Sequence, residues 1–169
     1  MSAKIPEFII TRAFDAPIDL VWRAWTIPEL MAKWWGPKGF TVGKYTMDLR
    51  PGGTYHYSIV GTDGKAMWGK FVYREVTALE KLVFVNCFSD EQGGVTRHPF
   101  HATWPLETLT TITLVNTENK TQVTIHWVPL NATETELKTF ADGMSSMQQG
   151  WTGTLDQLEL FLTEQRNKQ

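Results

Sequence analysis

Two histidines three residues apart, His98 and His101, come closest in this chain to a metal-binding pattern. Zinc needs three or four ligands, and near them only Cys87 and the acidic residues that follow it could add to the pair. Pro99 between the two histidines also restricts how their rings converge. We therefore expect a solvated loop here, and the sequence predicts no metal and no other cofactor.

Other catalytic patterns are sparse, because the chain has no Gly-x-Ser-x-Gly, no glycine-rich phosphate loop and no His-Glu-x-x-His. His56 and His126 alternate with apolar residues in predicted strands, so we expect both on the outer surface. Cys87 lies inside a predicted strand, where a thiol is usually inert. Asp48 and Arg50 flank a strand end, and either form a structural ion pair or anchor the polar group of a ligand. Whether the protein is an enzyme stays open.

A series of predicted strands must position these side chains. Apolar and polar residues alternate with a period of two, and turn residues separate the runs. The predicted strands cover residues 7–14, 40–49, 54–60, 67–76, 81–88, 107–116 and 121–128. The connection over residues 89–105 is long and largely polar, which indicates either a lid or a mobile tip.

Helices are predicted at two places. Pro17 and Pro28 each start a short helix after the first strand, because proline suits the first helical turn. Near the C-terminus, Thr133 and Glu136 form a capping box, and apolar residues then recur every three or four positions as far as Leu162. Three glycines interrupt this long helix at about 1 kcal/mol each. They indicate either close approach to the sheet, or a kink or a space left for a ligand. These glycines are Gly143, Gly150 and Gly153.

This order of elements predicts an α+β fold in one domain over residues 1–169. A curved antiparallel sheet of about seven strands would grip the long C-terminal helix, with two short helices after the first strand. One helix covers a curved sheet incompletely, so we expect a cavity beside it.

The chain also resembles the START-like (SRPBCC) helix-grip superfamily, which includes START lipid-transfer domains, polyketide cyclases and the birch-pollen allergen. Within it, the sequence is similar to bacterial homologues of the activator of the ninety-kilodalton heat-shock protein ATPase. The matching motifs are Phe14-Asp15-Ala16-Pro17, Val21-Trp22-Arg23-Ala24-Trp25-Thr26, Pro28-Glu29-Leu30, Trp34-Trp35-Gly36-Pro37, Met47-Asp48-Leu49-Arg50-Pro51-Gly52-Gly53, Leu82-Val83-Phe84 and Gly150-Trp151 through Leu155 and Leu158.

The resemblance implies the helix-grip fold and a cavity between the sheet and the helix. It also implies two departures, because related sequences often have His at the position of Met144 and Trp at the position of Asn86. Both changes alter the polarity of the cavity. The co-chaperone role in the family name belongs to eukaryotic proteins with an additional N-terminal domain.

Aromatic and methionine side chains would form the wall of this cavity, which is typical of a site for a small apolar molecule. The chain has eight tryptophans, an unusually large number. The predicted ligand-binding residues are Trp35, Asp48, Tyr57, Trp68, Phe84, Asn86, Met144, Met147, Gln148 and Trp151.

Three functions remain open for a chain with this wall and this resemblance. The first is a carrier or sensor of a small hydrophobic compound. The second is an enzyme of the cyclase or hydrolase type that uses Asn86, Gln148 or Asp48. The third is a protein-binding module, either chaperone-associated or a homodimer.

The composition limits the classes of partner that we expect. The net charge is −2 and no run of Lys and Arg is present, so we expect no nucleic-acid partner. The sequence shows no signal peptide and no apolar stretch long enough to span a membrane. The single cysteine fits a reducing compartment, and together these features predict a cytoplasmic protein without a membrane partner.

Overall fold

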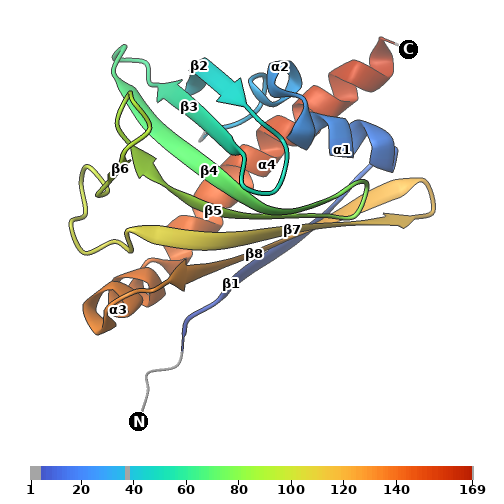
Figure 1. Ribbon diagram of the computed structural model, residues 1–169. Helices are drawn as coiled ribbons and strands as arrows, with labels where there is room; N and C mark the ends of the chain where they lie inside the picture. The colour runs from blue at the N-terminus through green and yellow to red at the C-terminus, as the bar shows by residue number, and fades with distance from the viewer. Residues whose placement is uncertain (1–4, 37–38, 169) are drawn as a thin grey trace.

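A curved antiparallel sheet dominates the computed structural model, which describes residues 5–36 and 39–168 (Figure 1). Its strand order is β1-β8-β7-β5-β4-β3-β2, and a short strand, β6, pairs with β5 outside this path. The strands are β1 (Phe8–Phe14), β2 (Thr41–Met47), β3 (Thr54–Val60), β4 (Ala66–Thr77), β5 (Lys81–Ser89), β6 (Val95–Thr96), β7 (Glu107–Thr117) and β8 (Lys120–Leu130). The predicted α+β fold is confirmed, with β6 as the one strand that the sequence pattern does not predict.

The alternation of side chains along the strands separates the two faces of the sheet. Tyr73 pairs with Phe84, and Phe71 pairs with Asn86, so these four side chains share one face. Irregular register between Tyr73 and Glu75, and a second irregularity in β2, add bends that help the sheet curve. The concave face therefore carries large aromatic residues, and it faces the helices.

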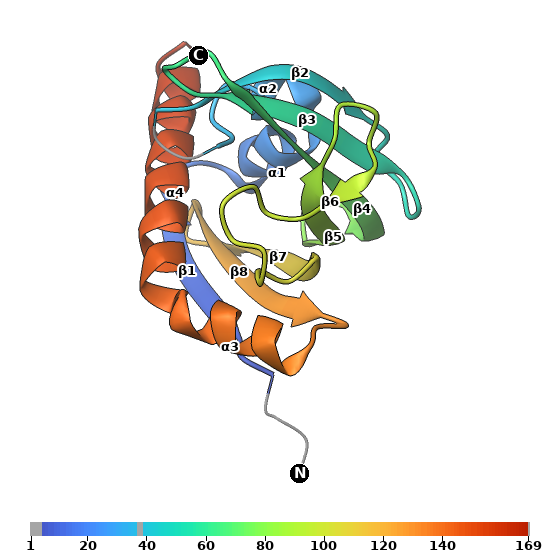
Figure 2. The same cartoon turned by 90° about the vertical axis from the view of Figure 1, so that its left-hand side faces the viewer.

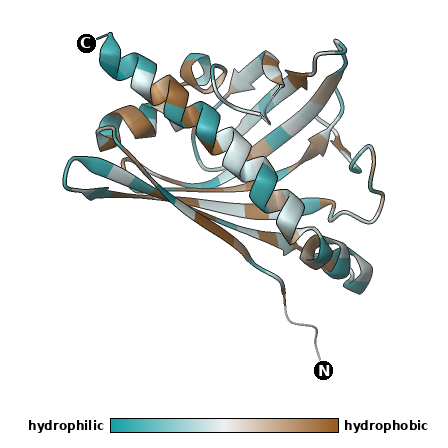
Figure 3. Ribbon diagram, turned by 180° about the vertical axis from the view of Figure 1, so that it is seen from behind, coloured by the Kyte–Doolittle hydropathy of each residue, from teal (hydrophilic) through white to brown (hydrophobic). Residues whose placement is uncertain are grey.

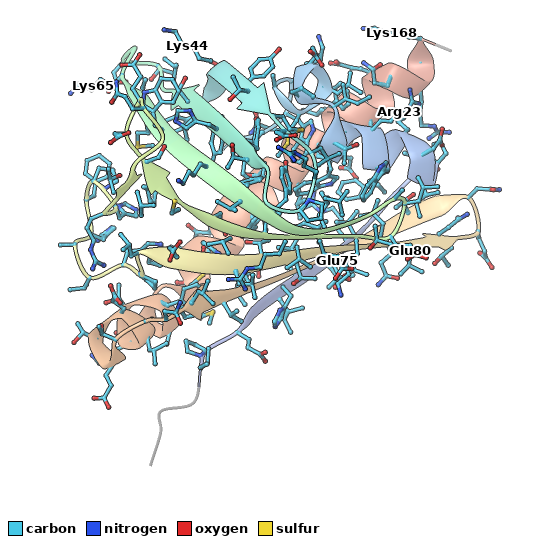
Figure 4. All side chains as sticks on the ribbon, in the orientation of Figure 1. Arg23, Lys44, Lys65, Glu75, Glu80 and Lys168 are labelled. Carbon is cyan, nitrogen blue, oxygen red and sulfur yellow. The ribbon has the colours of Figure 1, made fainter. Side chains whose placement is uncertain are left out.

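Two short helices close one end of this concave face. They are α1 (Ile18–Thr26) and α2 (Pro28–Met31), and Pro28 stands in the first turn of α2 as predicted. Trp25 and Trp34 are fully buried, and their ring centroids lie 4.7 Å apart. Trp34 Nε1 also donates a hydrogen bond to the carbonyl of Ala24 at 3.0 Å. Side chains fill the space between these helices and the sheet, whereas labelled charged residues such as Lys65 and Lys168 lie at the periphery (Figure 4).

The C-terminal helical segment consists of two helices, α3 (Glu134–Asp142) and α4 (Met144–Asn167). The predicted capping box is confirmed: Thr133 Oγ1 accepts from the Glu136 N–H at 3.1 Å, and Glu136 Oε1 accepts from the Thr133 N–H at 2.9 Å. The predicted long C-terminal helix is confirmed, and the interruption falls at one of the three predicted glycines, Gly143. Gly143 has φ −92° and ψ 8°, which departs from helical geometry and divides the segment.

Helix α4 crosses the concave face of the sheet diagonally, and it lies in front of the sheet in the view from behind (Figure 3). Its residues 144–153, here called the first half, and its residues 154–167, here called the second half, differ in burial. Most of its buried side chains belong to the second half, and they pack in the main core. The second half is also tied down by polar contacts, since Thr154 and Gln157 both donate to the carbonyl of Gly36, at 3.2 and 2.7 Å. In the first half, Met147 is the buried apolar residue. The second half of α4 is therefore packed into the core, whereas fewer side chains of the first half are buried.

Within the described part of the chain, no helix combines the length and the apolar character needed to cross a bilayer.

Candidate functional site

A cavity of about 680 Å³ lies beside the first half of α4. Its walls come from β3, β4, β5, β7 and β8, from the segment after α2, from α3 and α4, and from the connection between β6 and β7, which crosses in front of this region in Figure 2. Five of the eight tryptophans contribute to the wall. The aromatic lining residues are Trp35, Tyr57, Trp68, Phe88, Trp104, Trp127 and Trp151.

Five of the predicted residues lie together on this wall: Trp35, Tyr57, Asn86, Met147 and Trp151. Trp35 occupies a central place, because its ring centroid lies 6.1 Å from that of Tyr57 and 5.9 Å from that of Trp151, both at steep angles. Such edge-to-face arrangements are favourable for aromatic pairs. The sequence pattern thus brings residues from α4, from β3 and from the segment after α2 to one surface.

Trp68 reaches only the rim of the cavity. Strand alternation places its ring on the outer face of the sheet, where it stacks on His56 with centroids 4.8 Å apart and an interplanar angle of 24°. The expectation that His56 lies outside is therefore met. Trp68 contacts the cavity because it stands near the start of β4, next to the inward-facing Gly69.

Four other predicted residues lie outside the cavity. Phe84 is 1% exposed and stacks on Phe71, with ring centroids 4.0 Å apart, so it belongs to the packed core. Met144 packs against the edge of that core. Gln148 is exposed on the solvent side of α4. Asp48 Oδ2 accepts from Arg50 Nε at 2.8 Å, and both side chains are more than half exposed, so this is a surface ion pair.

The long connection after β5 contributes side chains to the cavity, although His101 and its neighbours stay exposed, as expected for a solvated loop. Both histidines line the cavity, and the His98 ring lies 4.6 Å from that of Phe88. Trp104 packs on Trp127, with centroids 5.6 Å apart, and on Phe140 of α3 at 5.4 Å. These contacts are the reason that the connection covers the cavity.

Sequence reasoning missed Trp104 and Trp127 as lining residues. The signal that could have found Trp104 is its spacing, since an aromatic or histidine side chain recurs at each third residue from His98 to Trp104. Polar contacts hold the same connection, because Arg97 forms an ion pair with Glu136 of the α3 capping box. Hydrogen bonds to the backbone of Thr133, and then Arg97, hold the pKa of Glu136 below its ordinary value.

His98 is neutral for a structural reason. Its Nδ1 accepts a hydrogen bond from the backbone N–H of Phe100 at 3.0 Å, which places the ring proton on Nε2. Burial, and then the neighbouring His101, lower the pKa of His98. The two imidazole centroids lie 4.8 Å apart. Among residues 5–36 and 39–168, no three His, Cys, Asp or Glu side chains gather closely enough to hold a metal ion.

Asn86 is a polar residue on the sheet side of the cavity. Its Oδ1 accepts hydrogen bonds from the hydroxyls of Thr108 and Thr110, both at 2.8 Å. Both threonines are buried on the neighbouring strand β7, which pairs with β5 in register. In this orientation the acceptor of the amide is already used.

Tyr57 contributes a phenol that stays protonated. Burial raises the pKa of Tyr57 to about 12. Its ring crosses above Gly69, where a β-carbon would lie 2.7 Å from the Tyr57 hydroxyl, so only glycine leaves room for it. Like Asn86, Tyr57 is thus a neutral polar group at neutral pH.

Formal charge is scarce on the described wall. The one acidic lining residue is Asp142, which forms an ion pair with Lys138 at 3.5 Å, and neither Lys nor Arg contributes to the lining. Aromatic surface with a few neutral hydrogen-bonding groups is suited to binding an apolar molecule.

The family model described as "Activator of Hsp90 ATPase homolog 1-like protein" matches residues 15–163. The chain belongs to this family. No curated protein matches the sequence of this family member.

Solved structures share the fold of this family over almost the whole chain. A protein from Nitrosomonas europaea is 24% identical, with a TM-score of 0.76 and 99% of each chain covered. A protein from Arthrobacter aurescens is 26% identical, with a TM-score of 0.77 and coverage of 96% of this chain and 92% of that one. The AHSA1 protein from Silicibacter pomeroyi is 16% identical, with a TM-score of 0.70 and coverage of 95% and 99%.

Proposed function

We propose that this family member binds a small, mostly apolar molecule in the cavity beside the first half of α4. The observation that carries the proposal is the cavity itself, about 680 Å³ lined by aromatic rings and Met147. This volume lies within the range of about 300–1,000 Å³ typical of ligand sites. Tryptophan presents a large apolar surface. The flexible side chain of methionine adapts to varied shapes.

The structure favours binding over catalysis by the residues that the sequence suggested. Asp48 and Gln148 lie outside the cavity, on the surface of the protein. Asn86 lines it, but a side-chain amide is neither an effective acid nor an effective base at neutral pH, and its oxygen already accepts two hydrogen bonds. A chaperone-associated role and a homodimer stay predictions from the sequence.

A neutral fluorescent probe, N-phenyl-1-naphthylamine, tests the proposal. Its emission rises when it enters an apolar site, so titration of the protein gives a Kd. Two adjacent serines on α4 offer a matched pair of variants, because both are exposed but only Ser146 lines the cavity, whereas Ser145 does not. We expect Ser146→Trp to fill space in the cavity and weaken probe binding about tenfold, a change of about 1.4 kcal/mol.

Ser145→Trp is the control, and we expect its Kd to stay within about twofold of the wild-type value. Circular dichroism and thermal melting would establish that both variants fold. The proposal fails if the wild-type protein does not enhance the emission of the probe, or if the two variants weaken binding equally.

A further inference from the structure

Two polar groups of the cavity, Asn86 and His98, are both hydrogen-bond donors, and this limits the class of ligand that fits the site. Asn86 has its amide oxygen occupied by Thr108 and Thr110, and within the described residues its Nδ2 group forms no hydrogen bond. The group that remains for a ligand is therefore a donor with two N–H bonds.

His98 is also a hydrogen-bond donor, for an independent reason. Its Nδ1 is occupied by the N–H of Phe100, so Nε2 carries the proton and is a donor. The ring packs on Phe88, which follows Asn86 by two residues on the same face of β5. Both donors thus border the same end of the cavity, one from the sheet and one from the covering connection.

The charges around these donors exclude a strongly anionic ligand. No Lys or Arg side chain lines the described wall, and its one carboxylate, Asp142, is paired with Lys138. A buried anion needs a cation or several donors to offset the loss of its hydration. A neutral acceptor oxygen needs only one or two hydrogen bonds, which Asn86 and His98 can supply.

We propose that the cavity selects a neutral, mostly apolar molecule that carries a carbonyl-type acceptor oxygen, and that Asn86 and His98 donate hydrogen bonds to that oxygen. This proposal rests on the proposed function, since it names the class of molecule bound at the same site. The aromatic rings would cover the apolar body of the ligand, and the two donors would fix its orientation.

Three naphthalene derivatives test this selection by quenching of tryptophan fluorescence. They share one apolar body and differ in their substituent: 2-acetylnaphthalene is a neutral ketone, 2-isopropylnaphthalene is a hydrocarbon of similar shape, and 2-naphthoate is an anion. One net hydrogen bond corresponds to about 0.5–1.5 kcal/mol, so we expect the ketone to bind about three- to tenfold more tightly than the hydrocarbon. We expect the naphthoate to bind more weakly than the ketone.

The paired substitution Asn86→Leu with Thr110→Val removes the donor. It replaces both members of a buried hydrogen bond with apolar groups, which preserves folding better than removal of one member. We expect this double variant to bind the ketone and the hydrocarbon equally. The single variant Thr110→Val is the control, because Thr108 still orients the amide, and it should keep the preference for the ketone.

The possible outcomes separate the two proposals. If neither neutral naphthalene quenches the fluorescence, the binding proposal fails and the donor proposal fails with it. If both bind with equal Kd, the cavity binds apolar molecules but the selection by donors is wrong. Tightest binding of naphthoate would overturn the preference for a neutral ligand. An independent readout is the ¹⁵N NMR spectrum of the His98 ring, in which we expect the Nε2–H tautomer at neutral pH, and the other tautomer would remove His98 as a donor.

Discussion

Replacement of Phe84 by alanine distinguishes a core residue from a ligand-binding residue. Phe84 is 1% exposed, and its ring stacks on Phe71 at 4.0 Å and meets Tyr73 edge-on at 6.1 Å. Truncation of a buried Phe to Ala typically costs about 3–5 kcal/mol, because the cost of the cavity left behind adds to the lost transfer free energy. We expect the free energy of unfolding of Phe84→Ala to fall by this amount.

Urea denaturation followed by circular dichroism measures this loss, and for a protein of this size it corresponds to a decrease in Tm of about 6–20 °C. Phe88→Ala is the matched control, since Phe88 lies four residues along the same strand, on the same face, but lines the cavity and is only partly buried. We expect Phe88→Ala to lose less stability and to weaken binding of N-phenyl-1-naphthylamine. A loss below about 1 kcal/mol for Phe84→Ala would refute the assignment of this residue to the core.

Two further substitutions test the C-terminal helices. A β-carbon at Gly150 would meet nothing within 4 Å, so Gly150→Ala should raise the free energy of unfolding by about 0.5–1 kcal/mol in urea denaturation, and a loss would show that the position needs glycine. Glu136 has a lowered pKa, so its charged form contributes stability that is present above the unfolded value of about 4.5 and is lost as the pH falls through the lower folded value. Glu136→Gln should therefore destabilise the protein by about 1 kcal/mol at pH 7, with a difference that disappears in strongly acidic solution; a difference independent of pH would contradict the role of the charge.

Periodicity in the sequence predicts the elements because the two periods, 2.0 for strands and 3.6 for helices, reflect local backbone geometry. The spacing of apolar residues from Leu137 to Leu162 therefore predicts helix correctly, and the capping box at Thr133 marks its start. The division at Gly143 is harder to predict. Three glycines in the segment all reduce helix propensity, and propensity alone does not tell which of them will break the helix.

The site is predicted less completely. Alternation shows on which face of a strand a side chain lies, but it does not show how far along that strand the helix packs against the sheet. Phe84 and Asn86 share the inner face of β5, but Phe84 lies under packed side chains and Asn86 borders the cavity. His98 and Trp104 lie in a connection without periodicity, so nothing in their local pattern shows that they fold back over the sheet. Their positions depend on contacts with Trp127 and Phe140, which are distant in the sequence from His98.

The composition of α4 explains where the packed core ends and the cavity begins. Its second half presents apolar side chains that fill the space against the sheet and α1, namely Leu155, Leu158, Phe161 and Leu162. Its first half offers mainly serine, glutamine and glycine around Met147, and these small or polar residues cannot fill the same width of sheet. The strands that face the first half of α4 still carry large aromatic residues, Tyr57 and Trp127, although this half of the helix presents few apolar side chains to them. An apolar wall without an apolar partner is unfavourable in water unless something covers it, and in this fold the connection with His98 and Trp104 covers it only in part, leaving room for a bound molecule.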